Sequence, residues 1–313
     1  VLDRARKYEI TMDNLRPGTT YTVALTKLTQ AAPFNNGLGQ PLGSVLTFHG
    51  VEIPEDIDNN NNNVMLEPWS SSSSWLPSRR VPLIGASDTA GFCVDGTPET
   101  RDALALPWKY DNCDKTSHAV LGRRWNAQVS VQAIAGIGLT QNAYAHLPFL
   151  LGKETMPDYY DRVLQTKDKP RWDFAAQYRP DLVIVSLGGN DFNHQKEVPS
   201  NETFVSAYHD FLLQIAEPHL ADAATTGPPT IVSICGQGDP TEAERDPNND
   251  RCRPCPHVEE ATLSFQEQYR DIIKVDYIFI PCDGSVVTGI DDIGCEGHKN
   301  ALGQERVADF VEQ

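Results

Sequence analysis

Short, unbroken runs of apolar residues are the feature of this chain that most restricts its fold. The clearest run covers residues 182–187 and ends in Gly188-Gly189. Four further candidate strands have the same character: residues 81–84, 129–134, 230–234 and 275–280. Runs of this length without polar alternation predict strands that are covered on both faces.

Helical patterns lie between these candidate strands. Residues 204–215 place apolar side chains at three- and four-residue spacing, which is typical of an amphipathic helix. Residues 259–273 and 301–311 are predicted to be helical as well. Strands alternating with helices predict an α/β fold with a doubly wound parallel sheet, and such sheets bind ligands outside the carboxyl ends of their strands.

The chain before this α/β region has a different composition. Residues 1–52 alternate polar and apolar residues between Pro/Gly/Asn turns, which predicts a small, incomplete β-sandwich. Residues 53–80 include an Asn run and a Ser run with too little apolar content for a core, so we interpret them as a linker. The α/β domain is predicted to cover residues 81–313.

Charge and hydropathy exclude several classes of partner. The 26 basic and 43 acidic residues give a net charge of −17, which disfavours binding to nucleic acids or to anionic membranes. The apolar runs are far shorter than the roughly 18 residues that span a bilayer, so no membrane anchor is expected. The first residue is Val1, so the lack of a visible signal peptide is uninformative.

Seven cysteines gather around loops instead of lying within predicted strands or helices. This placement predicts disulfides in an oxidising compartment, with one cysteine left over. The spacing of Cys252 and Cys255 also permits a metal site, but only His257 is near them and a second pair of ligands is lacking, so no metal is predicted. The sequon at Asn201 fits a secreted glycoprotein.

Four residues that follow predicted strands, or precede the last helix, could form the site of a serine hydrolase. Ser87 would expose its hydroxyl at a strand-to-helix turn, Gly136 offers a backbone N–H, and Asn190 offers a side-chain amide. His298 could act as a general base. Each residue has an ordinary alternative role: an N-cap for Ser87, a turn for Gly136, a helix cap for Asn190 and a surface position for His298. Their order along the chain favours the catalytic interpretation.

The segments around these residues resemble the SGNH hydrolases, and more narrowly the carbohydrate esterases of family two. The resemblance rests on four blocks: residues 84–92, 132–139, 180–192 and 297–300. Residues 47–52, 159–162 and 172–174 are also similar to that family. The resemblance implies a three-layer sandwich of the SGNH or flavodoxin-like type, preceded by a jelly-roll-like domain. It also implies Ser87 as the nucleophile and His298 as the base, with an oxyanion hole formed by Ser87 N–H, Gly136 and Asn190.

The chain departs from the family pattern at two positions. Ala86 stands where an Asp usually precedes the nucleophile, and Cys295 stands where most SGNH enzymes place the acid of the triad. Glu296, Asp292 or a backbone carbonyl could orient His298 instead, and we slightly favour Glu296.

Three disulfide pairings fit this resemblance. A bond between Cys282 and Cys295 would hold the His298 loop, and one between Cys93 and Cys113 would hold the loop after Ser87. We expect Cys235 to pair with Cys255, which leaves Cys252 unexplained.

The resemblance implies an extracellular esterase that removes acetyl groups from a polysaccharide or oligosaccharide, without a metal or an organic cofactor. A lipid or aryl-ester hydrolase is a second possibility, but the polar residues Asn142, Trp172 and Asn193 are better suited to a sugar. The third possibility is an inactive extracellular protein that keeps the fold and binds glycans or serves a structural role. The sequence leaves the oligomeric state open.

Overall fold

The structure, a computed structural model, describes residues 77–104, 109–144, 152–163, 168–174, 179–193, 195–220, 227–236 and 251–313, with four single positions among the first 76. From Pro77 onward the described residues belong to one compact unit. Apart from these four positions, the expected jelly-roll-like domain lies outside the described segments, as do all but the last four residues of the expected linker.

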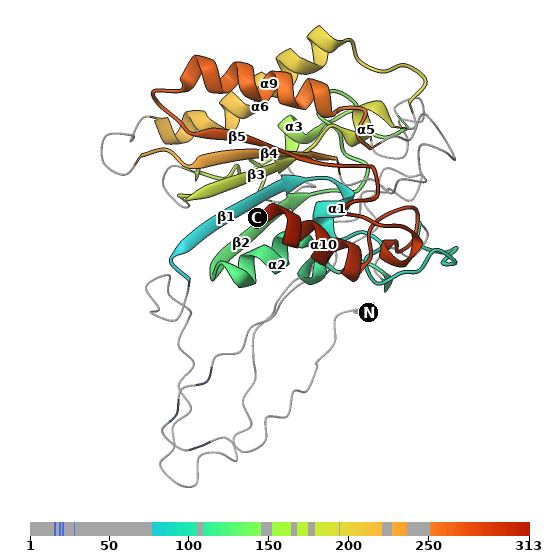
Figure 1. The fold of residues 1–313 in the computed structure, drawn as a ribbon. Helices are drawn as coiled ribbons and strands as arrows, with labels where there is room; N and C mark the ends of the chain where they lie inside the picture. The colour runs from blue at the N-terminus through green and yellow to red at the C-terminus, as the bar shows by residue number, and fades with distance from the viewer. Residues whose placement is uncertain are drawn as a thin grey trace. The chain divides into compact units, whose positions relative to one another are not determined.

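A five-stranded parallel sheet forms the centre of this unit (Figure 1). Its strands are β1 (Arg79–Gly85), β2 (Ala127–Ala133), β3 (Leu182–Ser186), β4 (Thr230–Gly236) and β5 (Val275–Ile280). They lie in the order β2-β1-β3-β4-β5, and every neighbouring pair is parallel. This order is typical of doubly wound sheets of the flavodoxin type. The predicted α/β fold is confirmed, and each expected strand is present within two residues of its predicted limits.

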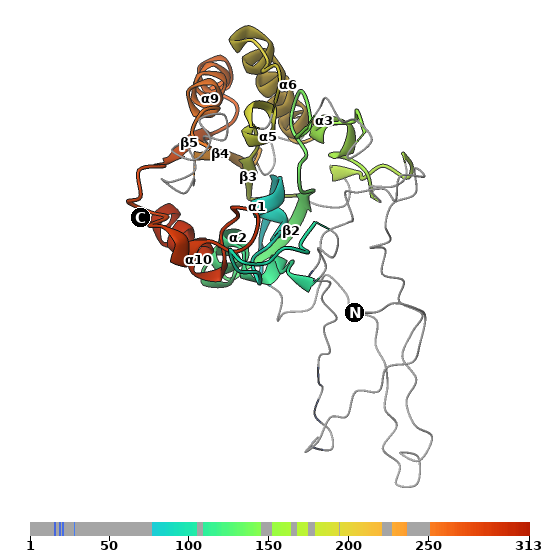
Figure 2. The ribbon, with the colours of Figure 1, turned by 90° about the vertical axis from the view of Figure 1, so that its right-hand side faces the viewer.

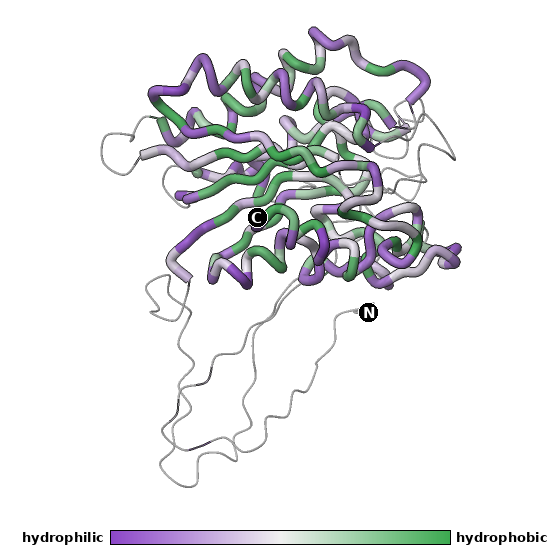
Figure 3. The backbone as a smooth tube through the Cα atoms, viewed as in Figure 1, coloured by the Kyte–Doolittle hydropathy of each residue, from purple (hydrophilic) through white to green (hydrophobic). Residues whose placement is uncertain are grey.

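Helices cover both faces of the sheet and complete three layers. Helices α6 (Asn201–Leu220) and α9 (Cys255–Tyr269) lie on one face, and α2 (Ser117–Arg124) and α10 (Ala301–Val311) lie on the other (Figures 1 and 2). Each face has its own cluster of buried apolar residues. Hydrophobic residues follow the central strands, and hydrophilic residues lie along the outer helices (Figure 3). No helix in the described segments is long and apolar enough to cross a membrane.

The sequence of α6 explains why this segment is helical and where it packs. Its apolar positions Phe204, Tyr208, Phe211, Leu212 and Ile215 are at most 1% exposed. The three- and four-residue spacing places them on one face of the helix, which contacts the sheet and α9. Burying each of these side chains contributes roughly 1.5–3 kcal/mol.

The edges of the sheet differ from the expectation of strands covered on both faces. β2 is an edge strand, and Val131 within it is 40% exposed. An apolar run alone cannot distinguish an edge strand from a central one, because strand order depends on contacts distant in sequence. Sequence analysis also missed α2, whose eight residues are too few for a clear apolar period. Thr116 caps α2 by accepting a hydrogen bond from Ala119 N (3.3 Å).

Candidate active site

Ser87 lies where β1 is followed by a short helix. β1 ends at Gly85, and α1 (Ser87–Ala90) begins two residues later. Glycine is required at position 85 because a Cβ there would lie 2.0 Å from Thr89 Oγ1. Ser87 is therefore placed at the carboxyl edge of the sheet, where it is only 9% exposed.

His298 contacts Ser87 directly. Its Nε2 lies 2.7 Å from Ser87 Oγ, and its Nδ1 lies 2.8 Å from the backbone carbonyl oxygen of Glu296. Because a carbonyl oxygen can only accept, Nδ1 must donate, which leaves the lone pair of Nε2 to accept from the Ser87 hydroxyl. The ring of Phe92 packs edge-on against the imidazole, with 4.9 Å between ring centroids. The two predicted residues therefore form a hydrogen-bonded pair with a defined tautomer.

The preference for Glu296 as the carboxylate that orients His298 was wrong. The side chain of Glu296 is exposed, and only its backbone carbonyl reaches the imidazole. Glu296 and Gly297 both adopt a left-handed backbone, with φ values of 52° and 69°. This tight turn places a main-chain oxygen, the third of the alternatives, beside Nδ1.

Asp292 does not orient His298 either. Its buried carboxylate accepts hydrogen bonds from Thr288 N (2.7 Å) and Thr288 Oγ1 (2.8 Å), and it lies 3.2 Å from Arg306 Nε. One carboxylate oxygen thus contacts Thr288 in the loop between β5 and α10, and the other contacts Arg306 in α10. Asp292 therefore stabilises the loop that carries His298 without contacting the imidazole.

The topology of the sheet places Ser87 between the two other predicted oxyanion donors. Gly136 follows β2 and Asn190 follows β3, and β1 lies between these two strands. Asn190 belongs to the short helix α5 (Gly189–Phe192), and its Nδ2 donates to Ile137 O (2.7 Å). Gly136 has φ 80°, a conformation that favours glycine. All three groups thus follow adjacent strands at the same edge of the sheet.

Asp191 fixes the loop next to this edge. Its carboxylate is fully buried and accepts hydrogen bonds from the backbone N–H groups of Leu139, Thr140 and Gln141 and from the Thr140 hydroxyl. Burial nevertheless raises the pKa of Asp191, against the effect of these donors. In the structure Asp191 links the segment after β2 to the segment after β3.

Three charged residues around the Ser87–His298 pair were not identified from the sequence. The Asp88 carboxylate lies 2.9 Å from Lys299 Nζ and 2.7 Å from Arg251 Nη1. Burial opposes ionisation of Asp88, but the charges of Lys299 and Arg251 outweigh it and hold its pKa well below the usual range. Burial and the charge of Arg251 lower the pKa of His298 to about 3, so its imidazole is neutral at pH 7. The only sequence signal was the position of Asp88 and Lys299, each next to a predicted catalytic residue.

Trp172 and Asn193, the predicted substrate-binding residues, belong to different parts of the structure. Trp172 lines a hollow of about 450 Å³ with the aromatic rings of Tyr160 and Phe174 and with acidic side chains that include Asp161. Asn193 follows α5 and is 7% exposed, and its Oδ1 has no hydrogen-bond partner in the described segments. No hydrogen bond in those segments links either side chain to Ser87 or His298.

Asn201, the predicted glycosylation site, begins α6. Its side-chain Oδ1 lies 2.6 Å from His257 Nδ1, and its Nδ2 donates to Glu260 Oε2 (3.1 Å). The residue is exposed, and glycosylation there stays a prediction.

The disulfides differ from two of the three expected pairings. The bonds are Cys93–Cys295, Cys235–Cys255 and Cys252–Cys282. Only Cys235–Cys255 agrees with the expectation. The other two were wrong because they joined cysteines near in sequence, whereas the loops after β1 and β5 meet in space. Cys113 takes part in none of the three bonds.

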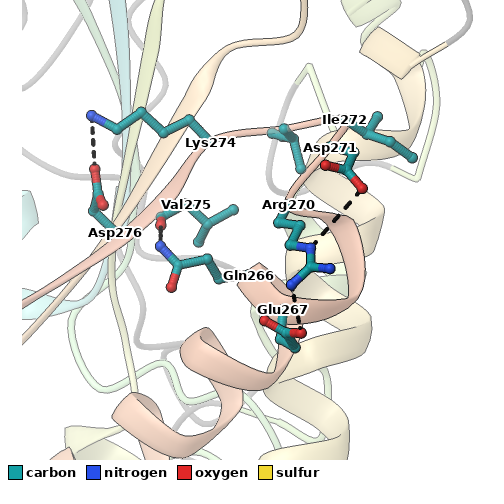
Figure 4. A pocket seen from close by; sticks show the side chains of 9 residues that line it. Gln266, Glu267, Arg270, Asp271, Ile272, Lys274, Val275 and Asp276 are labelled. Atoms are coloured by element: carbon teal, nitrogen blue, oxygen red, sulfur yellow. Dashed lines mark hydrogen bonds and ion pairs between the residues drawn. The ribbon is translucent and has the colours of Figure 1, made fainter.

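The hollow at the amino end of β5 is not related to this site (Figure 4). Residues from the end of α9 and the start of β5 line it, and their charges pair with one another: Arg270 with Glu267 and Asp271, and Lys274 with Asp276. Ser87 lies at the opposite, carboxyl edge of the parallel sheet. In the described segments, no group of three or more His, Cys, Asp or Glu side chains has an arrangement that could hold a metal.

Comparison with known proteins supports the interpretation of the sequence. An acetylxylan esterase/glucomannan deacetylase of Cellvibrio japonicus is 26% identical over 178 residues, which cover 55% of this chain and 47% of that protein. The chain resembles the carbohydrate esterases of family two. It spans about half the length of this curated relative, and no protein-family model matches it.

Solved structures of family-two carbohydrate esterases share the fold. One from Clostridium thermocellum, in complex with cellohexaose, has a TM-score of 0.58 and 24% identity over 76% of this chain and 64% of that chain. Another, from Corynascus thermopiles with its carbohydrate-binding domain, has a TM-score of 0.59 and 20% identity over 79% of this chain and 66% of that chain. At these identities the likeness establishes the fold alone.

Proposed function

We propose that this chain is a secreted serine esterase that removes O-acetyl groups from carbohydrate. The observation that carries the proposal is the 2.7 Å hydrogen bond between Ser87 Oγ and His298 Nε2 at the carboxyl edge of the sheet. A serine hydroxyl with a neutral imidazole in hydrogen-bond reach is the minimal arrangement for nucleophilic attack on an ester.

In the first half of the reaction, Ser87 Oγ attacks the carbonyl carbon of the acetyl group while His298 Nε2 takes the hydroxyl proton. The developing oxyanion is stabilised by donors from Ser87 N–H, Gly136 N–H and Asn190 Nδ2. The ester bond then breaks, and His298 returns the proton to the departing sugar hydroxyl. The product is acetyl-Ser87 and a free sugar hydroxyl.

In the second half, water attacks the acetyl-Ser87 carbonyl, and His298 takes a proton from that water. Collapse of the tetrahedral intermediate releases acetate and returns the proton to Ser87 Oγ. Throughout the cycle the Glu296 carbonyl accepts from Nδ1–H, which keeps the imidazole in the tautomer that both halves need.

The substrate class comes from the resemblance. The similar Cellvibrio japonicus protein is named for acetylxylan and glucomannan, so we propose acetylated polysaccharides or oligosaccharides of this kind as substrates. Trp172 provides an aromatic face and Asn193 provides an amide, and both groups suit contacts with a sugar ring.

Secretion is supported by the cysteine chemistry. Three disulfides form readily in an oxidising compartment and are rare in the cytosol. The exposed sequon at Asn201 fits the same route, and we propose that it is glycosylated.

The test is release of acetate from acetylated xylan, acetylated glucomannan and 4-nitrophenyl acetate by the wild type and by Ser87→Ala. We expect the wild type to release acetate and the variant to lose at least about 10³-fold in kcat. The matched control is Glu267→Gln, which changes an exposed ion pair at the opposite edge of the sheet and should leave kcat unchanged. Mass spectrometry should detect the acetyl adduct on Ser87 after rapid acid quenching.

The inactive glycan-binding alternative predicts a different outcome. In that case a folded wild type would release no acetate from any of the three substrates, yet would bind acetylated or plain oligosaccharides. Such a result would overturn the esterase proposal.

A further inference from the structure

A buried ion-pair cluster surrounds the Ser87–His298 pair. Asp88, which follows Ser87, holds Lys299 Nζ at one carboxylate oxygen and Arg251 Nη1 at the other. The Lys299 side chain is fully buried, and those of Asp88 and Arg251 are only 20% and 15% exposed. Burying a lysine is unfavourable unless its charge is paired, so a residue in this position calls for a physical explanation.

The contacts of this cluster link the residues on either side of His298 to Asp88. Lys299 follows His298, and its ammonium contacts Asp88. Gly297 precedes His298, and its carbonyl accepts from Arg251 Nη2 (2.7 Å), whose other nitrogen contacts Asp88. Both chain neighbours of His298 are therefore attached to the chain neighbour of Ser87.

We propose that Asp88 is a positioning residue, which fixes the loop of His298 relative to Ser87 through Lys299 and Arg251. This inference rests on the proposed function, because the position of the imidazole matters only if Ser87 is the nucleophile. The Cys252–Cys282 disulfide anchors the chain next to Arg251, so this member of the cluster is itself held in place.

The charges of the cluster also act on the imidazole. In the part of the chain that the structure describes, the groups that act on His298 are the Ser87 hydroxyl, the Phe92 ring, the Glu296 carbonyl and the three charged residues. Burial has the largest effect on the pKa of His298 and lowers it; the positive charges of Arg251 and Lys299 lower it further, whereas the negative charge of Asp88 raises it. Removing Asp88 would leave two cations to oppose the imidazolium that forms during catalysis.

A cluster that served only stability would behave differently under mutation. It would lower the melting temperature without moving the titration of His298. A positioning cluster should shift the pKa of His298 in opposite directions. The pKa should fall when Asp88 loses its charge and rise when Lys299 loses its charge.

The experiment compares Asp88→Asn, Lys299→Met and the double variant with the wild type. We expect Asp88→Asn to lower kcat on the order of 10²-fold, as small misplacements of catalytic groups do, with KM changed less than about twofold. Asp88→Asn leaves a buried ammonium with one ion pair fewer and can fail to fold. The double variant removes that ammonium as well and should recover folding, with a kcat between those of Asp88→Asn and the wild type.

Titration of the His298 imidazole by NMR, assigned with His298→Asn, provides a readout that does not need activity. We expect the pKa of His298 to be higher in Lys299→Met than in the wild type. In Asp88→Asn, if it folds, or in the double variant, we expect a lower pKa than in Lys299→Met. If the wild type is active and a folded Asp88 variant keeps its kcat, or if the His298 pKa does not respond, the positioning role is wrong. If the wild type releases no acetate, the proposed function fails, and the NMR titration still decides whether the cluster acts on His298.

Discussion

The imidazole of His298 takes its orientation from the backbone carbonyl of Glu296, 2.8 Å from Nδ1, and from no carboxylate in the described segments. A main-chain acceptor fixes the same tautomer as the aspartate of a catalytic triad, but it brings no negative charge to stabilise the imidazolium. The side chain at position 296 should therefore be dispensable.

Glu296→Asn tests this arrangement, because asparagine tolerates the left-handed backbone at that position (φ 52°). We expect kcat for acetate release to change by less than about threefold, which is less than about 1 kcal/mol in transition-state stabilisation. A loss of about 10²-fold or more in a folded variant would mean that the Glu296 carboxylate acts on the base after all.

The Cys93–Cys295 disulfide joins the loop after Ser87 to the loop before His298, and it closes 202 residues of chain. The chain-entropy model gives close to 5 kcal/mol for loops of at least about 100 residues and about 3 kcal/mol for loops of about 15. We expect replacement of both cysteines by serine to lower stability by a few kcal/mol, and also to lower kcat in the protein that remains folded. Denaturant unfolding and acetate release would measure the two effects.

The matched control is the Cys235–Cys255 bond, whose cysteines are only 20 positions apart in sequence and which joins the end of β4 to the start of α9. Replacing both of these cysteines should destabilise the protein less and leave kcat unchanged. Equal losses of kcat in the two double variants would contradict a specific role for Cys93–Cys295 in holding His298.

Asp191→Asn should disrupt the loop that follows β2. The carboxylate of Asp191 accepts from three backbone N–H groups and one hydroxyl, and an asparagine amide would turn an N–H₂ group toward some of these donors. Hydrogen bonds to a charged group contribute about 1.5–3 kcal/mol each, so we expect a loss of about 3 kcal/mol or more in the free energy of unfolding. Because the same loop follows Gly136, kcat should fall as well. A variant with unchanged stability and kcat would show that this carboxylate is not required.

His118 should make the stability of the protein depend on pH. Burial, with a smaller effect from Lys299, lowers its pKa in the folded state from 6.5 to about 4. Between these values the unfolded chain binds a proton that the folded protein does not, so the free energy of unfolding should decrease as pH falls. The slope for one such group is at most about 1.4 kcal/mol per pH unit.

His118→Asn removes this titration but can keep a hydrogen bond to Ser117 Oγ, which lies 3.3 Å from His118 Nδ1. Denaturant unfolding at several pH values between 4 and 6.5 should give a shallower dependence for the variant than for the wild type. The comparison concerns slopes, so a uniform loss of stability in the variant does not affect it. Parallel slopes would contradict the expected pKa of His118.

The pattern of apolar runs and motifs in the sequence was sufficient to predict the α/β sheet and the pairing of Ser87 with His298. Residues 182–187 and the other apolar runs each became a strand, because a strand covered by helices needs apolar side chains on both faces. Ser87 and His298 could be proposed as partners because motifs at the carboxyl ends of parallel strands meet at one edge. The helix over residues 204–215 followed from its apolar period.

Contacts between residues far apart in sequence decided the rest. Sequence distance made Cys93–Cys113 and Cys282–Cys295 the natural pairings, whereas the tertiary structure brings Cys93 to Cys295 across 202 residues. A backbone carbonyl cannot be recognised as the partner of His298 from sequence, because every residue carries one and only the turn at Glu296 directs it. Asp88, Arg251 and Lys299 look like ordinary charged residues in the sequence. They become one buried cluster because folding removes them from water together, and a buried charge is stable only beside its partners.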